Sequence, residues 1–83
     1  MWRIIYDKAA TKQLEKLPPY IQVEIKSGLE NHYWGKMYRY MVGLRVASSF
    51  WPVIIGNYRI LCKTSGSRQL VDVVDISLNV SRE

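Results

Sequence analysis

The strongest constraint on the fold is the dipeptide Gly56-Asn57, which alone separates two apolar runs, Phe50 to Ile55 and Tyr58 to Lys63. A two-residue loop with glycine first suits a type II′ turn, which joins neighbouring antiparallel strands. The loop length also sets the register of the two strands, so Ile54 is predicted to lie opposite Arg59. The sequence therefore predicts a β-hairpin at the centre of the fold.

The two faces of this hairpin differ in character, because residues paired across two strands project from the same face of a sheet. The face predicted to lie beneath the helices is apolar throughout: Trp51, Val53, Ile55, Tyr58, Ile60 and Cys62. The face predicted to be open contains both charged residues of the hairpin, Arg59 and Lys63, together with Phe50, Pro52, Ile54 and Leu61. Arg59 is therefore expected to project from the uncovered side of the sheet.

The N-terminal third predicts one strand and a helical hairpin. Trp2 to Tyr6 is rich in apolar and β-branched residues, and Asp7 after it is placed to cap a helix. Pro18 and Pro19 stop this helix, and a second helix is predicted from about Pro19 to Glu30. Apolar residues recur at helical spacing in both segments: Ala10, Leu14 and Leu17, then Ile21, Ile25 and Leu29.

The remaining segments complete an α+β domain. Residues 31–49 show no sustained period and predict a loop with one short strand or turn. Thr64 to Arg68 predicts a second turn, and Leu70 to Ile76 a last strand. The order is β-α-α-β-β-β, with the helices on one face of an antiparallel sheet that contains a three-stranded meander. At this length, residues 1–83 are expected to form a single domain.

Composition excludes several classes of protein. No apolar run approaches the roughly 18 residues of a membrane span, and the N-terminus lacks the features of a signal peptide, so a cytoplasmic protein is expected. One cysteine, Cys62, cannot form an internal disulfide. With one distant histidine, His32, it also falls short of the ligand set of a zinc site. We therefore expect no metal and no cofactor.

The charge is concentrated in the middle of the chain. Residues 31–70 contain six basic and no acidic side chains, and they carry seven of the ten aromatic residues. Basic side chains neutralise phosphates and aromatic rings stack on unpaired bases, so this block suits single-stranded RNA. A solvated basic face beside core aromatics explains the same composition. The residues that we expect to contact phosphate are four basic residues of this block, Lys36, Arg39, Arg45 and Lys63, and one beyond it, Arg82.

Three motifs in this order resemble a known family. They are the helical segment "LEKLPPYIQVEIKSGLE", the hairpin "WPVIIGNYRILC", which is preceded by "GK" at Gly35-Lys36, and the Val-rich last strand. Together they resemble the RelE/ParE superfamily of toxins from type II toxin–antitoxin systems, whose matching strand usually reads W-R-x-R-x-G-D-Y-R. The resemblance covers nearly the whole chain in element order.

The resemblance implies a RelE-like fold and, in the RelE branch, a toxin that cleaves mRNA in the ribosomal A site without a metal. Arg59 matches the arginine of the family's G-D-Y-R, which implies a catalytic role in stabilising charge on the scissile phosphate. The alternative is a surface arginine paired across the sheet with Asp72 or Asp75. The resemblance also implies a cognate antitoxin as partner, with a toxin–antitoxin heterotetramer as one form of the complex. Apolar residues of the open face would contact the antitoxin: Phe50, Ile54 and Leu61.

The sequence departs from the RelE branch at several catalytic positions. Two basic residues on the preceding strand are replaced by Pro52 and Ile54, and the C-terminal pattern I-x-H-R-x-x-Y falls on Ile76 to Arg82 without its His, Arg or Tyr. The remaining candidate for proton transfer is His32. A lone histidine at the end of a helix is more often a helix-end or surface residue than a catalytic one. These departures keep two alternatives open, a ParE-like poison of DNA gyrase and an inactive homologue that still binds an antitoxin.

Overall fold

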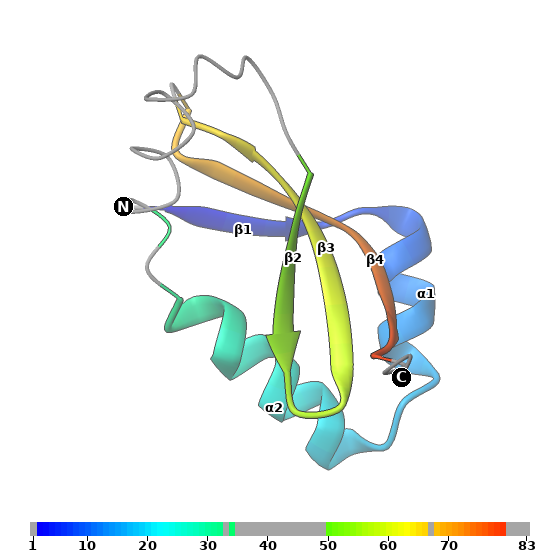
Figure 1. The fold of residues 1–83 in the computed structure, drawn as a ribbon. Coiled ribbons are helices and arrows are strands. Elements are labelled where there is room, and N and C mark those ends of the chain that lie inside the picture. Colours follow the sequence, from blue (N-terminus) through cyan, green and yellow to red (C-terminus); the bar gives the residue numbers. More distant parts are fainter. Residues whose placement is uncertain (1, 33, 35–49, 67, 80–83) are drawn as a thin grey trace.

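The computed structural model describes residues 2–32, 34, 50–66 and 68–79, which form two helices and four strands in the predicted β-α-α-β-β-β order. Figure 1 shows the elements, whose bounds are β1 Arg3–Tyr6, α1 Lys8–Glu15, α2 Pro19–Glu30, β2 Phe50–Ile55, β3 Tyr58–Ser65 and β4 Leu70–Leu78. The α+β fold class is therefore confirmed. Neither described helix is long and apolar enough to cross a membrane.

The four strands form one sheet in the order β1-β4-β3-β2. β2, β3 and β4 are antiparallel neighbours, as the predicted meander requires. The prediction of a wholly antiparallel sheet was wrong, because β1 pairs parallel to β4, with Arg3 opposite Leu70 and Tyr6 opposite Val73. The helices follow β1 at one edge of the sheet and precede β2 at the other edge, and two antiparallel reversals then bring β4 beside β1 in the same direction.

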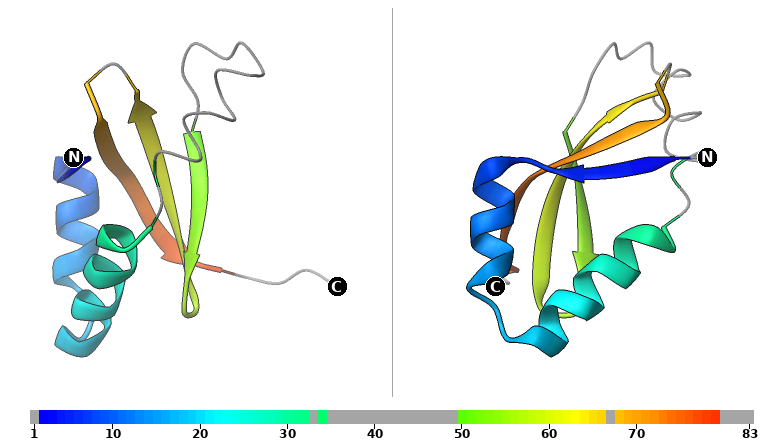
Figure 2. Two further views of the ribbon diagram at one scale, coloured as in Figure 1. Left: turned by 90° about the vertical axis from the view of Figure 1, so that its left-hand side faces the viewer. Right: turned by 180° about the vertical axis from the view of Figure 1, so that it is seen from behind.

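Both helices lie on the same side of the sheet (Figure 2). The carboxylate of Asp7 accepts a hydrogen bond from the N–H of Ala10 at 2.8 Å and caps α1 as predicted. The second helix begins at Pro19, a first-turn position where the missing N–H costs no helical hydrogen bond. The backbone N–H groups of Ile21 and Gln22 both donate to the carbonyl of Pro18, which starts α2 directly after the break.

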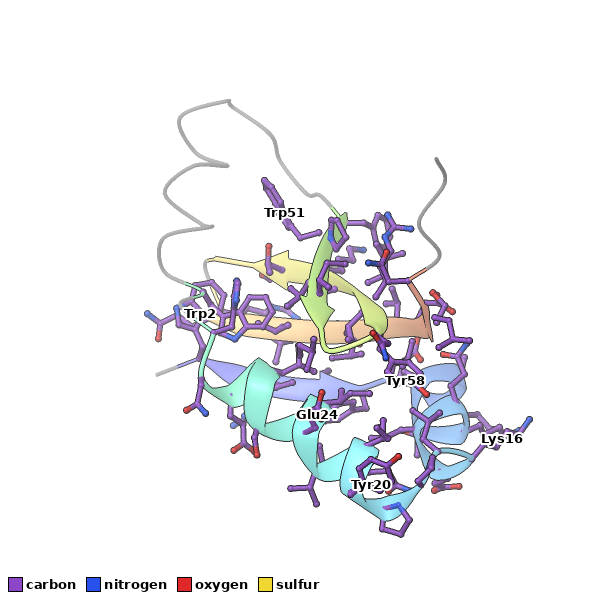
Figure 3. All side chains as sticks on the ribbon, turned by 60° about the horizontal axis from the view of Figure 1, so that its bottom comes forward. Trp2, Lys16, Tyr20, Glu24, Trp51 and Tyr58 are labelled. Carbon is purple, nitrogen blue, oxygen red and sulfur yellow. The ribbon has the colours of Figure 1, made fainter. Side chains whose placement is uncertain are left out.

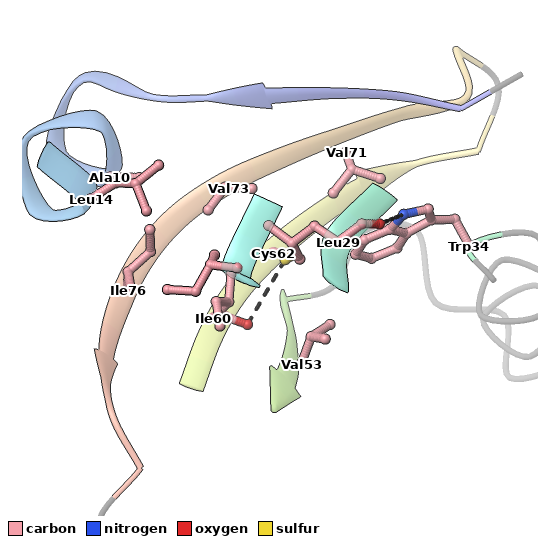
Figure 4. Close-up of a cluster of buried hydrophobic side chains, with 11 residues drawn as sticks. Ala10, Leu14, Leu29, Trp34, Val53, Ile60, Cys62, Val71, Val73 and Ile76 are labelled. Carbon is pink, nitrogen blue, oxygen red and sulfur yellow. Dashed lines mark hydrogen bonds between the residues drawn. The ribbon is translucent and has the colours of Figure 1, made fainter. Parts of the chain in front are cut away.

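The core lies between the helices and the sheet (Figure 4). Its fully buried members come from every layer and include Ile25 and Leu29 of α2 and Ile60 of β3. Trp34 is also part of this core, and its indole N–H donates to the carbonyl of Leu29 at 2.9 Å. The same carbonyl also accepts a hydrogen bond from the backbone N–H of His32 at 3.3 Å, so both donors close the end of α2.

Three element bounds differ from the sequence prediction. β1 begins at Arg3, β3 continues through Thr64 to Ser65, and β4 reaches Leu78. A register shift in β4 opposite Leu61 and Cys62 leaves Val74 as the extra residue of a β-bulge. Thr64 is buried inside the longer strand, so the turn that was predicted to begin there starts after Ser65. Most of the predicted 31–49 loop lies outside the described residues.

Candidate functional site

The predicted register of the β2–β3 hairpin is confirmed residue by residue, from Phe50 opposite Lys63 to Ile55 opposite Tyr58. Gly56 has a φ of 57°, whereas Asn57 has no positive φ, as a type II′ turn requires. A Cβ at Gly56 would also collide with the carboxylate of Glu24 on α2, which Figure 3 labels close to the hairpin. The positive φ of the turn therefore favours glycine at this position, whereas the Glu24 side chain could move aside for a Cβ.

Arg59 projects from the open face of the sheet, as the sequence predicted, and is exposed. Its partner on β2 is Ile54, whose side chain is 51% exposed, and its partner on β4 is Ser77. In the part of the chain that the structure describes, the guanidinium makes no hydrogen bond and no ion pair. No described residue therefore occupies the N–H donors of the guanidinium, which suit a ligand such as phosphate.

The two carboxylates that were the alternative partners of Arg59 are placed elsewhere. Oδ1 of Asp75 accepts a hydrogen bond from Nε2 of Gln13 on α1 at 2.8 Å. Asp72 lies opposite Lys63, and its Oδ1 is buried without a hydrogen-bond partner among the described residues. The interpretation of Arg59 as one half of a cross-strand ion pair is therefore wrong for both carboxylates.

Lys63 lies on the same face as Arg59, four residues further along β3. At the usual rise of a strand this separates the two residues by about 13 Å. The Nζ of Lys63 lies 5.9 Å from the centroid of the Phe50 ring, a cation–π arrangement between directly opposed residues. Because of this spacing, Arg59 and Lys63 suit two different phosphates of one strand better than a single phosphate.

The remaining predicted site residues fall into two groups. Three of them share the open face as predicted, with Phe50 57% exposed, Ile54 next to Arg59 and Leu61 half-buried. The other basic candidates lie outside the described residues: Lys36, Arg39, Arg45 and Arg82. Their expected contact with phosphate therefore stays a prediction.

The candidate for proton transfer, His32, is not on the face of Arg59. It follows α2, on the helical side of the sheet, and its ring packs against Trp34 with 4.6 Å between centroids. Burial lowers the pKa of His32, which favours the neutral imidazole. His32 and Arg59 therefore lie on opposite sides of the sheet.

Two aromatic residues of the 31–70 block lie on the covered side, Trp34 in the core and Tyr58 on the hairpin face where the sequence predicted it. Trp34 is only 3% exposed, and Tyr58 is half-buried and packs against the core. Trp51, labelled in Figure 3 together with Tyr58, is also half-buried. Of the described aromatic residues in the 31–70 block, Phe50 alone combines an exposed ring with the open face.

Cys62 occupies the centre of the covered face and is fully buried. Burial raises the pKa of its thiol to about 12, with a smaller contribution from the negative charge of Asp72. A thiol with this pKa stays protonated at neutral pH and is a poor nucleophile. In the described ranges, no three His, Cys, Asp or Glu side chains come together as a group that could hold a metal ion.

Sequence reasoning missed two features that shape the open face. The first is Gln13, whose amide reaches from α1 to the edge of β4, and no local pattern marks that contact. The second is the bulge at Val74, which brings Asp75 rather than Val74 opposite Leu61. The sequence does contain a signal for this bulge. The apolar residues that prove to be buried are two positions apart at Val71 and Val73, but three positions apart at Val73 and Ile76.

Comparison with known proteins adds no relative, since no family model, no curated protein and no solved structure matches this chain.

Proposed function

We propose that this chain is the toxin component of a type II toxin–antitoxin system and inhibits translation by ribosome-dependent cleavage of mRNA, without a metal. The observation that carries the proposal is the exposed guanidinium of Arg59 on the open face of the sheet, with no carboxylate bound to it in the described structure. Its place in the Gly56-Asn57-Tyr58-Arg59 turn is the motif shared with RelE-like toxins. Translation takes place in the cytoplasm, which is the compartment that we propose for the protein.

Arg59 would bind the scissile phosphate rather than transfer a proton. A guanidinium presents a planar fork of N–H donors that matches two phosphate oxygens, and it stays charged at any physiological pH. The 2′-hydroxyl of the RNA loses its proton to water as it attacks the adjacent phosphorus, and the 5′-oxygen leaves with a proton from water. Negative charge increases on the phosphoryl oxygens during this step. Binding that charge in the transition state is the contribution we assign to Arg59.

A second candidate function is a binding protein of the same fold that performs no phosphodiester chemistry. The neighbours of Arg59 on the open face favour it, since Ile54, Pro52 and Ser77 offer no group that exchanges protons near neutral pH. Such a protein would poison DNA gyrase or simply bind an antitoxin. In either case the exposed apolar side chains of Phe50 and Ile54 provide area that an antitoxin segment would bury.

Primer extension on mRNA bound to purified ribosomes tests the proposal. We expect the wild-type protein to cut within the A-site codon, and Arg59→Ala to lose at least tenfold in cleavage rate. Arg68→Ala is the matched control, because Arg68 is an exposed arginine in the turn after β3 and its replacement makes the same change in charge. The control should cleave like the wild type.

The same preparation should be assayed for inhibition of gyrase supercoiling. Intact mRNA at saturating protein, together with inhibition of gyrase, would replace the nuclease with the ParE-like function. Intact mRNA and active gyrase, with binding of a cognate antitoxin retained, would leave only the antitoxin-binding homologue.

A further inference from the structure

β2 is an edge strand of the described sheet, because the strand order β1-β4-β3-β2 gives it one neighbour, β3 (Figure 1). The other side of an edge strand presents backbone N–H and C=O groups that can pair with another chain. Which residues present these groups follows from the register of the hairpin and from the pairing of β3 with β4.

The backbone of Pro52 faces outward at this edge. In a hairpin with a two-residue loop, the residues that flank the loop exchange hydrogen bonds, and this alternation continues through Val53 opposite Ile60 and Trp51 opposite Cys62. The N–H of Asn79 donates to the carbonyl of Asn57 at 2.8 Å, just before β3, and with Arg59 opposite Ser77 the alternation implies that odd-numbered residues of β3 face β4. Hydrogen bonds toward β2 therefore come from even-numbered residues of β3, and the outward groups of β2 belong to Phe50, Pro52 and Ile54.

Proline has no N–H, so the central outward residue of β2 offers an acceptor but no donor. At this position proline costs the β2–β3 ladder nothing, because the donor it lacks would have pointed away from β3. The register places it where a proline weakens pairing with an incoming strand and leaves the native hairpin intact.

The rest of β2 is well suited to self-association. The six residues Phe50–Ile55 are apolar, uncharged and rich in β-branched and aromatic side chains, the composition of segments that stack into intermolecular sheets. Two of its side chains, Phe50 and Ile54, are more than half exposed. Apart from Pro52, the described strand carries no charge, proline or bulge that would discourage pairing at this edge.

We infer that Pro52 prevents β2 from pairing with β2 of a second copy of this chain. Two identical edges that meet about a two-fold axis at residue 52 would bring Pro52 opposite Pro52, with Phe50 opposite Ile54 on either side. The central pair then loses both of its hydrogen bonds, one for each missing N–H. This inference concerns the backbone of β2 and is independent of the proposed toxin activity.

Sedimentation velocity and light scattering across a concentration series test the inference with Pro52→Val and Pro52→Thr. Both substitutions restore the donor with a residue that favours strands. We expect both variants to form dimers or larger sheets at concentrations at which the wild type is monomeric. We also expect the combined variant Pro52→Val and Ile54→Lys to return to monomer, because a lysine on an edge strand opposes pairing.

Ser77→Val is the matched control, because it adds an apolar, β-branched residue to the same open face without changing the β2 edge. Circular dichroism and urea unfolding establish that each variant is folded. Association of Ser77→Val equal to that of Pro52→Val would overturn the inference in favour of simple surface hydrophobicity. A Pro52→Val or Pro52→Thr variant that is folded and no more associated than the wild type would also overturn it.

Discussion

Oε1 of Gln13 on α1 accepts a hydrogen bond from the backbone N–H of Ile76 on β4 at 2.9 Å. The same amide donates through Nε2 to Asp75, so one side chain pairs with two neighbouring residues of the strand. β1 covers only residues 70–73 of β4, and beyond them this edge has no strand beside it in the described sheet. Gln13 thus takes the place of a strand where β1 ends, and its amide binds the Asp75 carboxylate.

Gln13→Leu is expected to lower the free energy of unfolding by about 1–3 kcal/mol, because it leaves the N–H of Ile76 without its acceptor. Urea unfolding followed by circular dichroism measures the change. Lys12→Leu is the control, since Lys12 is exposed on the same helix and its replacement should change stability by less than about 0.5 kcal/mol. Equal stability of the Gln13 variant and the control would show that the contact contributes little.

Gly28→Ala is expected to destabilise the protein, although alanine favours a helix by about 1 kcal/mol over glycine. A Cβ at this position would lie 2.7 Å from Cδ1 and 3.0 Å from Cγ1 of Ile55, so α2 could not keep its distance from β2. In an Ile55→Ala background, which removes these atoms, the same substitution should become neutral or stabilising. A double-mutant cycle by urea unfolding checks this reversal of sign, and additive effects would contradict the close approach.

Stability is expected to fall at alkaline pH because of Cys62. Its folded pKa, raised to about 12, lies above that of an exposed thiol at about 8.5, so above this lower value the unfolded chain loses a proton that the folded chain keeps. The free energy of unfolding should therefore decrease as the pH rises from about 9 toward 12. Burial also raises the pKa of Tyr6, which acts in the same direction only above pH 10.

Urea midpoints at pH 8, 9 and 10 measure the effect of Cys62. Cys62→Ala should show a shallower decrease with pH than the wild type, whatever its own cost at pH 8. Labelling with a thiol reagent at pH 8 should be slow in the folded wild type and fast in urea. Identical pH slopes for the two proteins, or rapid labelling of the folded chain, would contradict this account.

Arg59 and Lys63 are expected to contribute separately to RNA binding, since about 13 Å of strand separates them. If each contacts one phosphate of a single strand, replacing either by glutamine should reduce the slope of log K against log salt concentration by about 0.7. The double replacement should reduce it by the sum of the two. Fluorescence anisotropy with a short single-stranded RNA measures these slopes. Lys26→Gln is the control, because Lys26 is an exposed residue of α2. A double variant with the slope of a single variant would indicate a shared phosphate.

Much of the candidate site could be predicted because it depends on local geometry. The exposure of Arg59 follows from its distance in sequence from Gly56-Asn57 and from the two-fold period of a strand. That neither Asp72 nor Asp75 binds it could not be predicted in this way, because the bulge at Val74 and the amide of Gln13 together set the position of Asp75. Trp34 likewise belongs to the core rather than to the RNA surface because of its contact with Leu29, outside the hairpin.

The sequence by itself determined the helical hairpin, the β2–β3 register and the division of that hairpin into a covered and an open face. Each of these depends on residues a few positions apart, for which turn length, proline breaks and side-chain period are decisive. Only the tertiary structure decided that β1 runs parallel to β4 and that Gln13 pairs with Ile76. Both contacts join segments more than 60 residues apart. They depend on how the helices pack against the sheet, and no periodic pattern in the chain marks them.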